Sequence, residues 1–473
     1  MGSRFRGGWT CGFAAAALCV LAFPMSLQAR AETLEAVLVE AYRSNPTLNA
    51  QRAGVRAIDE GVPQALSGYR PKISINATGG EQSLSSITKV TSTTPSTYST
   101  ISGYNSPAGA GITATQTLFN GFQTANRTRQ AESQVLAARE TLRQTEQNVL
   151  LNAATAYMNL LRDTAILSLQ ESNVKVLQEQ LRQVRDRFNV GEVTRTDVAQ
   201  SESRVAAGRS QVLTAESNYK TSAAVYRQVI GSDPGKLVPA TPVDRFSPHS
   251  LSGAVATGSA GHPLVASAEY NIDVAQSQVK VAEGALLPTL SLQGNATQNF
   301  LVPGSLVTEK SYSASVLGTL SVPIYQGGAE YSLIRQAKET LGQRRIDFDT
   351  AREQVRQTVV QSWGQLEAAK ANIEATQAQV TAAEIALNGV REEARVGQRT
   401  TLDVLNAQQE LVNARVALVG AQRDRVVASY TLLAGVGRLS PQVLGLHVPV
   451  YNAEVHYQQV RDSWAGVRTP DGR

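Results

Sequence analysis

The side chains that most often do chemistry in proteins are present in this sequence, but none stands at a spacing that a reaction or a metal would need. The four histidines are scattered along the chain without metal-ligand spacing, at His249, His262, His447 and His456. Ser, Thr and Asp are abundant, yet none lies in a Gly-x-Ser-x-Gly or phosphate-loop context. The sequence therefore predicts no enzyme, no metal site and no cofactor.

The polar residues that remain as candidates gather in a motif that occurs twice. Residues 187–198 read Arg-Phe-Asn-Val-Gly-Glu-Val-Thr-Arg-Thr-Asp-Val, and residues 393–404 read Glu-Ala-Arg-Val-Gly-Gln-Arg-Thr-Thr-Leu-Asp-Val. The two glycines, at 191 and 397, differ in number by 206, and an aspartate follows each at the same distance. A carboxylate in the first turn of a helix is favoured by about 0.3–1 kcal/mol, so both acids have a structural explanation.

The duplication extends beyond this motif. Residues 118–121 pair with 324–327 at the same offset of 206, whereas 70–75 pair with 287–292 at an offset of 217. The first copy is therefore longer between these points by the difference of the two offsets. Such a pattern is typical of a duplicated scaffold that tolerates insertions at one end.

Apolar residues that recur every seven positions predict long coiled-coil helices. One set runs from Val135 to Phe188 with a four-residue shift between its blocks, and its counterpart runs from Leu341 to Val390. A helix over residues 125–188 would be on the order of 95 Å long at roughly 1.5 Å per residue, too long for a compact domain. Each copy is thus predicted to hold a long helix, a glycine turn and a returning helix. A generic antiparallel coiled-coil spacer would show the same periodicity.

Short alternating segments distinguish the chain from a simple coiled coil. Apolar and polar residues alternate at 72–78, 110–115, 290–294 and 314–322, in the modest pattern of membrane β-barrel strands, although a soluble sandwich would alternate too. Residues 83–107 are crowded with Ser, Thr and Tyr and are predicted to be an exposed loop. Open sheet edges do not occur in lipid, so four strands that enter a membrane require several chains to share one barrel.

The first 31 residues are predicted to be a signal peptide, because a basic start and an apolar run at 11–25 precede Ala-Arg-Ala at 29–31. A lipoprotein attached at Cys19 is the alternative, but Leu18 stands where a small residue is wanted. Removing this segment takes away three arginines and both cysteines, so the formal charge falls from +5 to +2 and no disulfide is expected. This charge gives no indication of a nucleic-acid partner, and no later segment is apolar enough to cross a membrane as a helix.

These segments together resemble the TolC outer-membrane efflux protein family from about residue 32 to 457. The resemblance rests on Tyr-Arg-Ser-Asn-Pro-Thr-Leu at 42–48, His-Pro-Leu-Val at 262–265, the duplicated glycine turns, and Asp-Val-Leu-Asn-Ala at 403–407. It implies a mixed α/β membrane protein in which a trimeric β-barrel, with four strands per chain, continues into a long periplasmic α-helical coiled-coil barrel.

The same resemblance divides the internally duplicated chain into parts. Two structural repeats, at 32–240 and 241–435, would each supply a helix, a strand pair and a long helix hairpin. Residues 436–473 would form a C-terminal tail that wraps the equator of the tunnel or is disordered.

In function, the resemblance implies a passive exit duct in the cell outer membrane for a tripartite efflux pump or a type I secretion system. The partners would be two further copies of the chain, a periplasmic adaptor protein, an inner-membrane transporter and outer-membrane lipid. A periplasmic coiled-coil adaptor is the alternative. Adaptors, however, lack a duplicated helical pair with amphipathic strands between the copies. The sequence does not specify the cargo.

The resemblance also assigns roles to residues near the two turns. Asp403, Asn406 and Asp197 match the periplasmic entrance, although the family has an acid where Asn406 stands. Arg399 and Thr196 match a lock between neighbouring coils, but Ala394 replaces a frequent Tyr, so we expect an entrance that opens more easily. Glycines at the helix tips are also what a tight turn needs. The adaptor would dock on the tips at Val190, Gly191, Glu192, Val396, Gly397 and Gln398.

Overall fold

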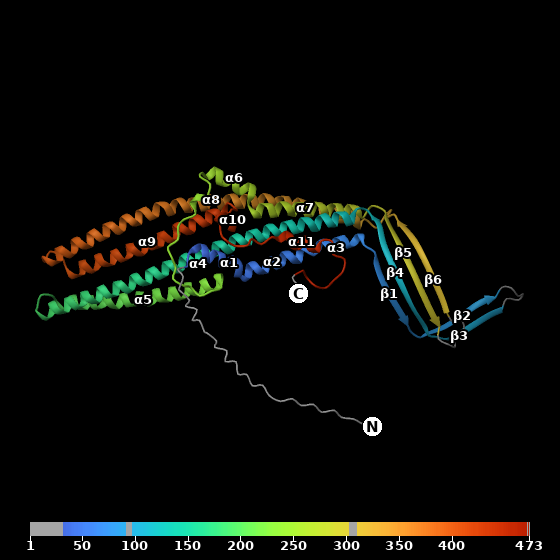
Figure 1. Ribbon diagram of the computed structural model, residues 1–473, viewed down its shortest axis with the longest axis horizontal. Helices are drawn as coiled ribbons and strands as arrows, with labels where there is room; N and C mark the ends of the chain where they lie inside the picture. Colours follow the sequence, from blue (N-terminus) through green and yellow to red (C-terminus); the bar gives the residue numbers. More distant parts are fainter. Residues whose placement is uncertain (1–31, 91–96, 302–309, 471, 473) are drawn as a thin grey trace, which may run out of the picture.

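The computed structural model describes residues 32–90, 97–301, 310–470 and 472. They form an elongated molecule with two helical hairpins at one end, a β-sheet at the other and a helical body between them (Figure 1). The predicted signal peptide lies outside the described residues. Within the described part of the chain, no helix is long and apolar enough to cross a membrane.

Two helices of 67 residues each run the length of the helical part, α4 (Gln123–Asn189) and α8 (Ala329–Arg395). Each spans about 100 Å at 1.5 Å per residue. Shorter helices return beside them, α5 (Arg195–Ile230) and α9 (Thr401–Gly435). The predicted long helix, glycine turn and returning helix are therefore confirmed in both copies.

The seven-residue pattern along α4 is buried or half-buried except at the tip. Val135, Leu142 and Leu160 are buried as expected, whereas Phe188, in the last turn, is 42% exposed. Between them, polar side chains take buried positions, among them Asp163 and Asn173. Buried polar groups need hydrogen-bond partners, so specific contacts between helices are expected in the half of α4 that is nearer the tip.

The four predicted strands form one antiparallel sheet in the order β1-β4-β5-β6. The strands are β1 (Lys72–Gly79), β4 (Pro107–Asn120), β5 (Thr289–Leu301) and β6 (Lys310–Ser321). Each copy supplies two strands, and the pairing of β4 with β5 joins the copies.

The register of the sheet separates an apolar face from a polar one. Ile75 pairs with Ile112, which pairs with Ala296, which in turn pairs with Ala314. The neighbouring row is Asn76, Gly111, Thr297 and Ser313. Because directly paired residues share a face and successive residues alternate, one face is apolar and the other polar across all four strands.

The prediction of a loop at 83–107 is wrong for the residues that the structure describes there. They form an exposed hairpin of two strands, β2 (Gln82–Val90) and β3 (Thr97–Asn105), which make a separate sheet. Its Ile87, Tyr98 and Tyr104 are exposed as expected of a surface segment. The Ser and Thr content indicated a loop, but Thr, Ile and Tyr also favour extended backbone once a partner strand lies alongside.

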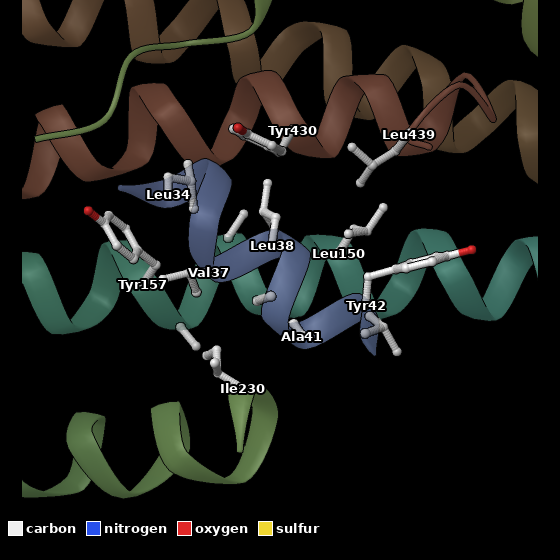
Figure 2. Packing of buried hydrophobic residues seen from close by; sticks show 14 of the residues in the cluster. Leu34, Val37, Leu38, Ala41, Tyr42, Leu150, Tyr157, Ile230, Tyr430 and Leu439 are labelled. Carbon is white, nitrogen blue, oxygen red and sulfur yellow. The ribbon is translucent and has the colours of Figure 1, made fainter. Parts of the chain in front are cut away.

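Short helices near the N-terminus lie along α4, and the first two of them help to build the largest apolar cluster of the described residues. They are α1 (Leu34–Ser44), α2 (Pro46–Asp59), α3 (Gly61–Leu66) and the 3-10 turn η1 (Ser67–Tyr69). Figure 2 shows α1 between α4, α9 and the end of α5, with Leu38 among Leu150, Tyr430 and Leu439. Tyr157 of α4 donates a hydrogen bond to the carbonyl of Val238 at 2.6 Å and so closes one end of this core.

The second copy has the counterparts α6 (Leu251–Gly261) and α7 (Pro263–Gly284), which lie along α8. The 3-10 turn η2 (Asp244–Phe246) precedes them. After α9 the chain forms α10 (Pro441–Leu444) and α11 (Ala453–Val460). His456 of α11 places Nδ1 2.9 Å from Oδ2 of the buried Asp59, which fixes α11 against α2.

Candidate functional site at the helix tips

The two glycine turns at the hairpin tips have the same backbone geometry. Gly191 has φ +81° and Gly397 φ +80°, and an added Cβ at either position would meet no atom within 4 Å. Glycine is therefore required by the left-handed backbone and not by crowding. Val190 and Val396, just before the glycines, are 72% and 71% exposed, so each tip presents an apolar side chain to solvent.

Each returning helix begins with a capping box. The Asp403 carboxylate accepts hydrogen bonds from the Thr400 backbone N–H at 3.0 Å and hydroxyl at 2.8 Å, and Thr400 Oγ1 accepts from the Asp403 N–H. Asp197 makes the same contacts with Thr194. These hydrogen bonds hold the pKa of both carboxyls below the usual value, so both are charged at neutral pH.

An ion pair crosses each turn, with its charges in opposite order. Arg187 precedes the first glycine and Glu192 follows it, and Arg187 Nε lies 2.9 Å from Glu192 Oε2. At the second turn, Glu393 takes the place of Arg187, and its Oε2 lies 2.7 Å from Arg399 Nε. The guanidinium of Arg399 is thus engaged within its own hairpin. No hydrogen bond links it to the exposed Thr196 among the residues that the structure describes.

Asn406 of α9 contacts the hairpin formed by α4 and α5. Arg204 of α5 donates from Nη2 to Oδ1 of Asn406 at 2.7 Å. One helical turn separates Asn406 from Asp403, so this contact lies just above the predicted entrance level.

A second polar contact and an apolar cluster support this junction. Buried Gln408 of α9 donates from Nε2 to Asn173 Oδ1 of α4 at 3.4 Å and accepts from Arg391 Nη2 at 3.0 Å. Leu177, Val205 and Leu405 pack beside it. We call Arg204, Asn406, Asn173, Gln408 and Arg391 the inter-hairpin latch.

Sequence reasoning found only Asn406 among the latch residues. A usable signal was present at Asn173, a polar residue directly before Val174 of the seven-residue pattern. Arg204 carried no such signal, because exposed arginines are common on helices.

Within the described residues, no group of three or more His, Cys, Asp or Glu side chains could hold a metal ion. A groove of about 480 Å³ does lie beside the latch, between α4 and the end of α8, with Lys175, Glu179 and Arg391 among its lining residues. Its lining residues are polar or charged except for Val176.

Hairpins of this length that continue into a two-faced sheet with open edges define a subunit of a channel-tunnel. The chain belongs to the family described as outer membrane efflux protein, whose sequence profile matches residues 37–232 and 259–438. Its location is accordingly the outer membrane.

Relatives cover nearly the whole chain. It is 44% identical over 447 residues to the outer membrane efflux protein BepC of Brucella suis biovar 1 (strain 1330), with 94% of each chain covered. It is 27% identical over 432 residues to the outer membrane protein TolC of Escherichia coli (strain K12), covering 88% of this chain and 84% of that one. The fold is similar to that of the Campylobacter jejuni CmeC outer membrane channel, with a TM-score of 0.71 at 17% identity, covering 91% of this chain and 89% of that one.

Proposed function

We propose that this protein is the outer-membrane exit duct of a tripartite efflux pump or a type I secretion system, built from three copies of the chain. The two-faced sheet with open edges carries the proposal. Lipid contacts would fall on the apolar face around Ile75 and Ile112, and an aqueous lumen on the polar face around Asn76 and Thr297.

The sheet edges support assembly. Among the described strands, β1 and β6 each pair on one side only. Unpaired backbone groups are costly in lipid, at several kcal/mol each, so β6 of one copy pairs with β1 of the next until the barrel closes. Three copies with four strands each give a barrel of twelve strands.

At the periplasmic end, the tips receive an adaptor protein. Val190 and Val396 offer apolar contacts, and the ion pairs across the turns hold the exposed backbone in one shape. The groove beside Lys175 and Arg391 lengthens the contact along the hairpins. The duct itself supplies no energy, which comes from an inner-membrane transporter.

The entrance is held by the inter-hairpin latch. In this proposal Arg204 and Asn406 keep α5 against α9, and Gln408 with Asn173 keeps α9 against α4. Opening requires these contacts to break as the hairpins separate. A role for Arg399 and Thr196 toward a neighbouring copy, and for Asp403 and Asp197 as an entrance ring, stays a prediction.

The test is retention of a fluorescent efflux dye in cells with and without the gene. Greater retention without the gene, restored by the wild-type chain, supports efflux. Ile75→Asp puts a charge on the lipid face and should fail to restore efflux, whereas Leu213→Asp, on the exposed side of α5, should succeed. A heat-modifiable trimer in the outer-membrane fraction is expected, and a monomer in the inner membrane would favour an adaptor instead.

If dye retention does not change although the trimer is present in the wild type, efflux is rejected as the role of the duct. The proteins in the culture media of the two strains would then be compared. A protein that is missing from the medium of the strain without the gene would identify secretion as the role.

A further inference from the structure

The chain after α11 returns to the point where the sheet begins. Arg70, two residues before the start of β1, donates from Nη1 to the carbonyl oxygen of Ser463 at 2.5 Å. Its guanidinium carbon also lies 4.7 Å from the centroid of the Trp464 ring. In Figure 1 the segment after α11 loops out beside α3, at the sheet end of the helical body. Two contacts from one arginine thus fix this loop at the junction of helices and sheet.

The loop presents large apolar side chains to solvent at this junction. Trp464 is 72% exposed although its ring is held by Arg70, and Val467 is fully exposed. Tyr69, next to Arg70, is also exposed. Trp and Tyr concentrate at membrane–water interfaces, where an apolar ring and a polar edge are both satisfied.

The charges around the loop suit a lipid surface. Arg70, Lys72 and Arg468 lie within or beside it, and Asp462 and Asp471 are the acids nearby in sequence. Basic residues next to a membrane-spanning segment attract anionic lipid headgroups. The patch is also continuous with β1, whose apolar side chains begin at Ile73.

We propose that residues 463–468 are an interfacial anchor that lies on the periplasmic leaflet of the outer membrane. Trp464 and Val467 enter the boundary between headgroups and acyl chains, and Arg70 holds Trp464 in place. The anchor rests on the proposed insertion of the sheet, because only then does the start of β1 mark the membrane surface. It would tie the C-terminal tail, and through His456 the helix α2, to a defined depth in the membrane.

The test uses the absence of cysteine from residues 32–473. Val467→Cys, labelled with bimane, is reconstituted as the full trimer in vesicles of phosphatidylethanolamine and phosphatidylglycerol. Its fluorescence is then measured with brominated acyl chains and, separately, with iodide in the water. We expect a loss of intensity with brominated lipid and little loss with iodide.

Two labelled positions serve as controls. Ile75→Cys on the apolar face of the sheet should be quenched by brominated lipid, and Leu213→Cys on α5 should be quenched by iodide only. If Ile75→Cys is not quenched by lipid, the proposed insertion of the sheet fails. If it is quenched while Val467→Cys responds only to iodide, the anchor alone is overturned. Protection of Val467→Cys from both quenchers would also overturn it, since a neighbouring copy would then cover the loop.

The role of Arg70 is tested in the same labelled chain. Arg70→Ala should shift Val467→Cys from lipid quenching toward iodide quenching, whereas Arg468→Ala should leave the hold on Trp464 intact and change the signal less. Heat-modifiable migration of each variant checks that the trimer has assembled. Unchanged lipid quenching in Arg70→Ala would show that Arg70 does not position the loop.

Discussion

Arg204 and Asn406 lie 202 residues apart in sequence, yet their side chains meet at 2.7 Å between the two hairpins of one chain. Each side chain is on a returning helix, so the contact joins the two helices that start at the capped turns. Asn406 offers a neutral acceptor to a cation, which makes the contact weaker than an ion pair would be. An exposed hydrogen bond of this kind suits a junction that must open and close.

Removing this contact should ease opening of the entrance. Arg204→Ala is expected to raise the single-channel conductance or the open fraction of the purified trimer in planar bilayers. Asn406→Asp should do the opposite, because it converts the contact into an exposed ion pair worth about 0.2–1 kcal/mol. Arg209→Ala, at an exposed position on the same helix, is the matched control and should match the wild type. Equal conductance in all four proteins would contradict the latch.

Substitutions at Asp403 separate a capping role from an entrance role. Asp403→Asn removes the charge but keeps an oxygen that accepts from the Thr400 N–H, whereas Asp403→Ala removes both. If the charge acts at the entrance, both variants should lose block by divalent cations to the same extent. If only the cap matters, Asp403→Ala should destabilise the start of α9 more than Asp403→Asn does, because only the amide still accepts from the Thr400 N–H. The corresponding pair at Asp197 shows whether the two copies differ.

The glycine turns predict a large effect from a single methyl group. Gly397→Ala forces a side chain into the left-handed region and should cost about 1–2 kcal/mol. Gly389→Ala, in the interior of α8 with open space around it, should instead stabilise by about 0.5–1 kcal/mol. Hydrogen exchange of the α8–α9 turn would measure both. An adaptor cross-linking assay should then lose signal for Gly397→Ala and keep it for Gly389→Ala.

Docking can be tested without changing the backbone. Val396→Asp keeps the turn but places a charge on the exposed apolar tip, so it should weaken adaptor cross-linking while the trimer still forms. The equivalent Val190→Asp tests the first tip. Undiminished cross-linking in the double variant would rule out the tips as the docking site.

His262 gives a pH dependence with a defined sign. Its Nδ1 accepts from the Leu264 N–H at 3.1 Å and so caps α7, and burial, with a smaller contribution from Arg143, lowers its pKa to about 4. Below about pH 6.5 His262 is therefore protonated in the unfolded chain, whereas in the folded chain it stays neutral until the pH approaches 4. Stability is therefore fully present above pH 6.5 and falls by on the order of 3 kcal/mol as the pH drops toward 4.

His262→Asn provides the comparison, because Asn also accepts at an N-cap but does not titrate. Heat unfolding of the two trimers between pH 7 and 4 should show a steeper loss in the wild type. Parallel curves would mean that His262 is not responsible for the acid sensitivity.

Periodic patterns in the sequence predicted most of the fold, because they report local geometry. The seven-residue apolar repeat predicted the helix α4, and the alternation of apolar and polar residues around Ile73 and Ile112 predicted the strands β1 and β4, which lie at the expected residues. The β2–β3 hairpin was missed because Ser and Thr are compatible with both loop and strand. Only pairing with a second strand decides between them.

The site was predicted less well, for a physical reason. The turns and caps at Gly397 and Asp403 depend on a few neighbouring residues, so the motif located them. The contact of Arg204 with Asn406 depends on how two hairpins cross, and the contact of Gln408 with Asn173 depends on which polar residues are buried between them. A local pattern can mark a polar residue such as Asn173, but it does not identify the residue that the side chain contacts.

The strand order β1-β4-β5-β6 also constrains the sequence of events in folding. β4 ends at Asn120 and its partner β5 begins at Thr289, so an entire helical hairpin lies between two neighbouring strands. Closing such a long loop costs entropy before any strand contact forms, whereas the α4–α5 hairpin closes locally around its glycine turn. The helices of the first copy should therefore form while the second is still being exported. The sheet should come together late, when all four strands are present to share it.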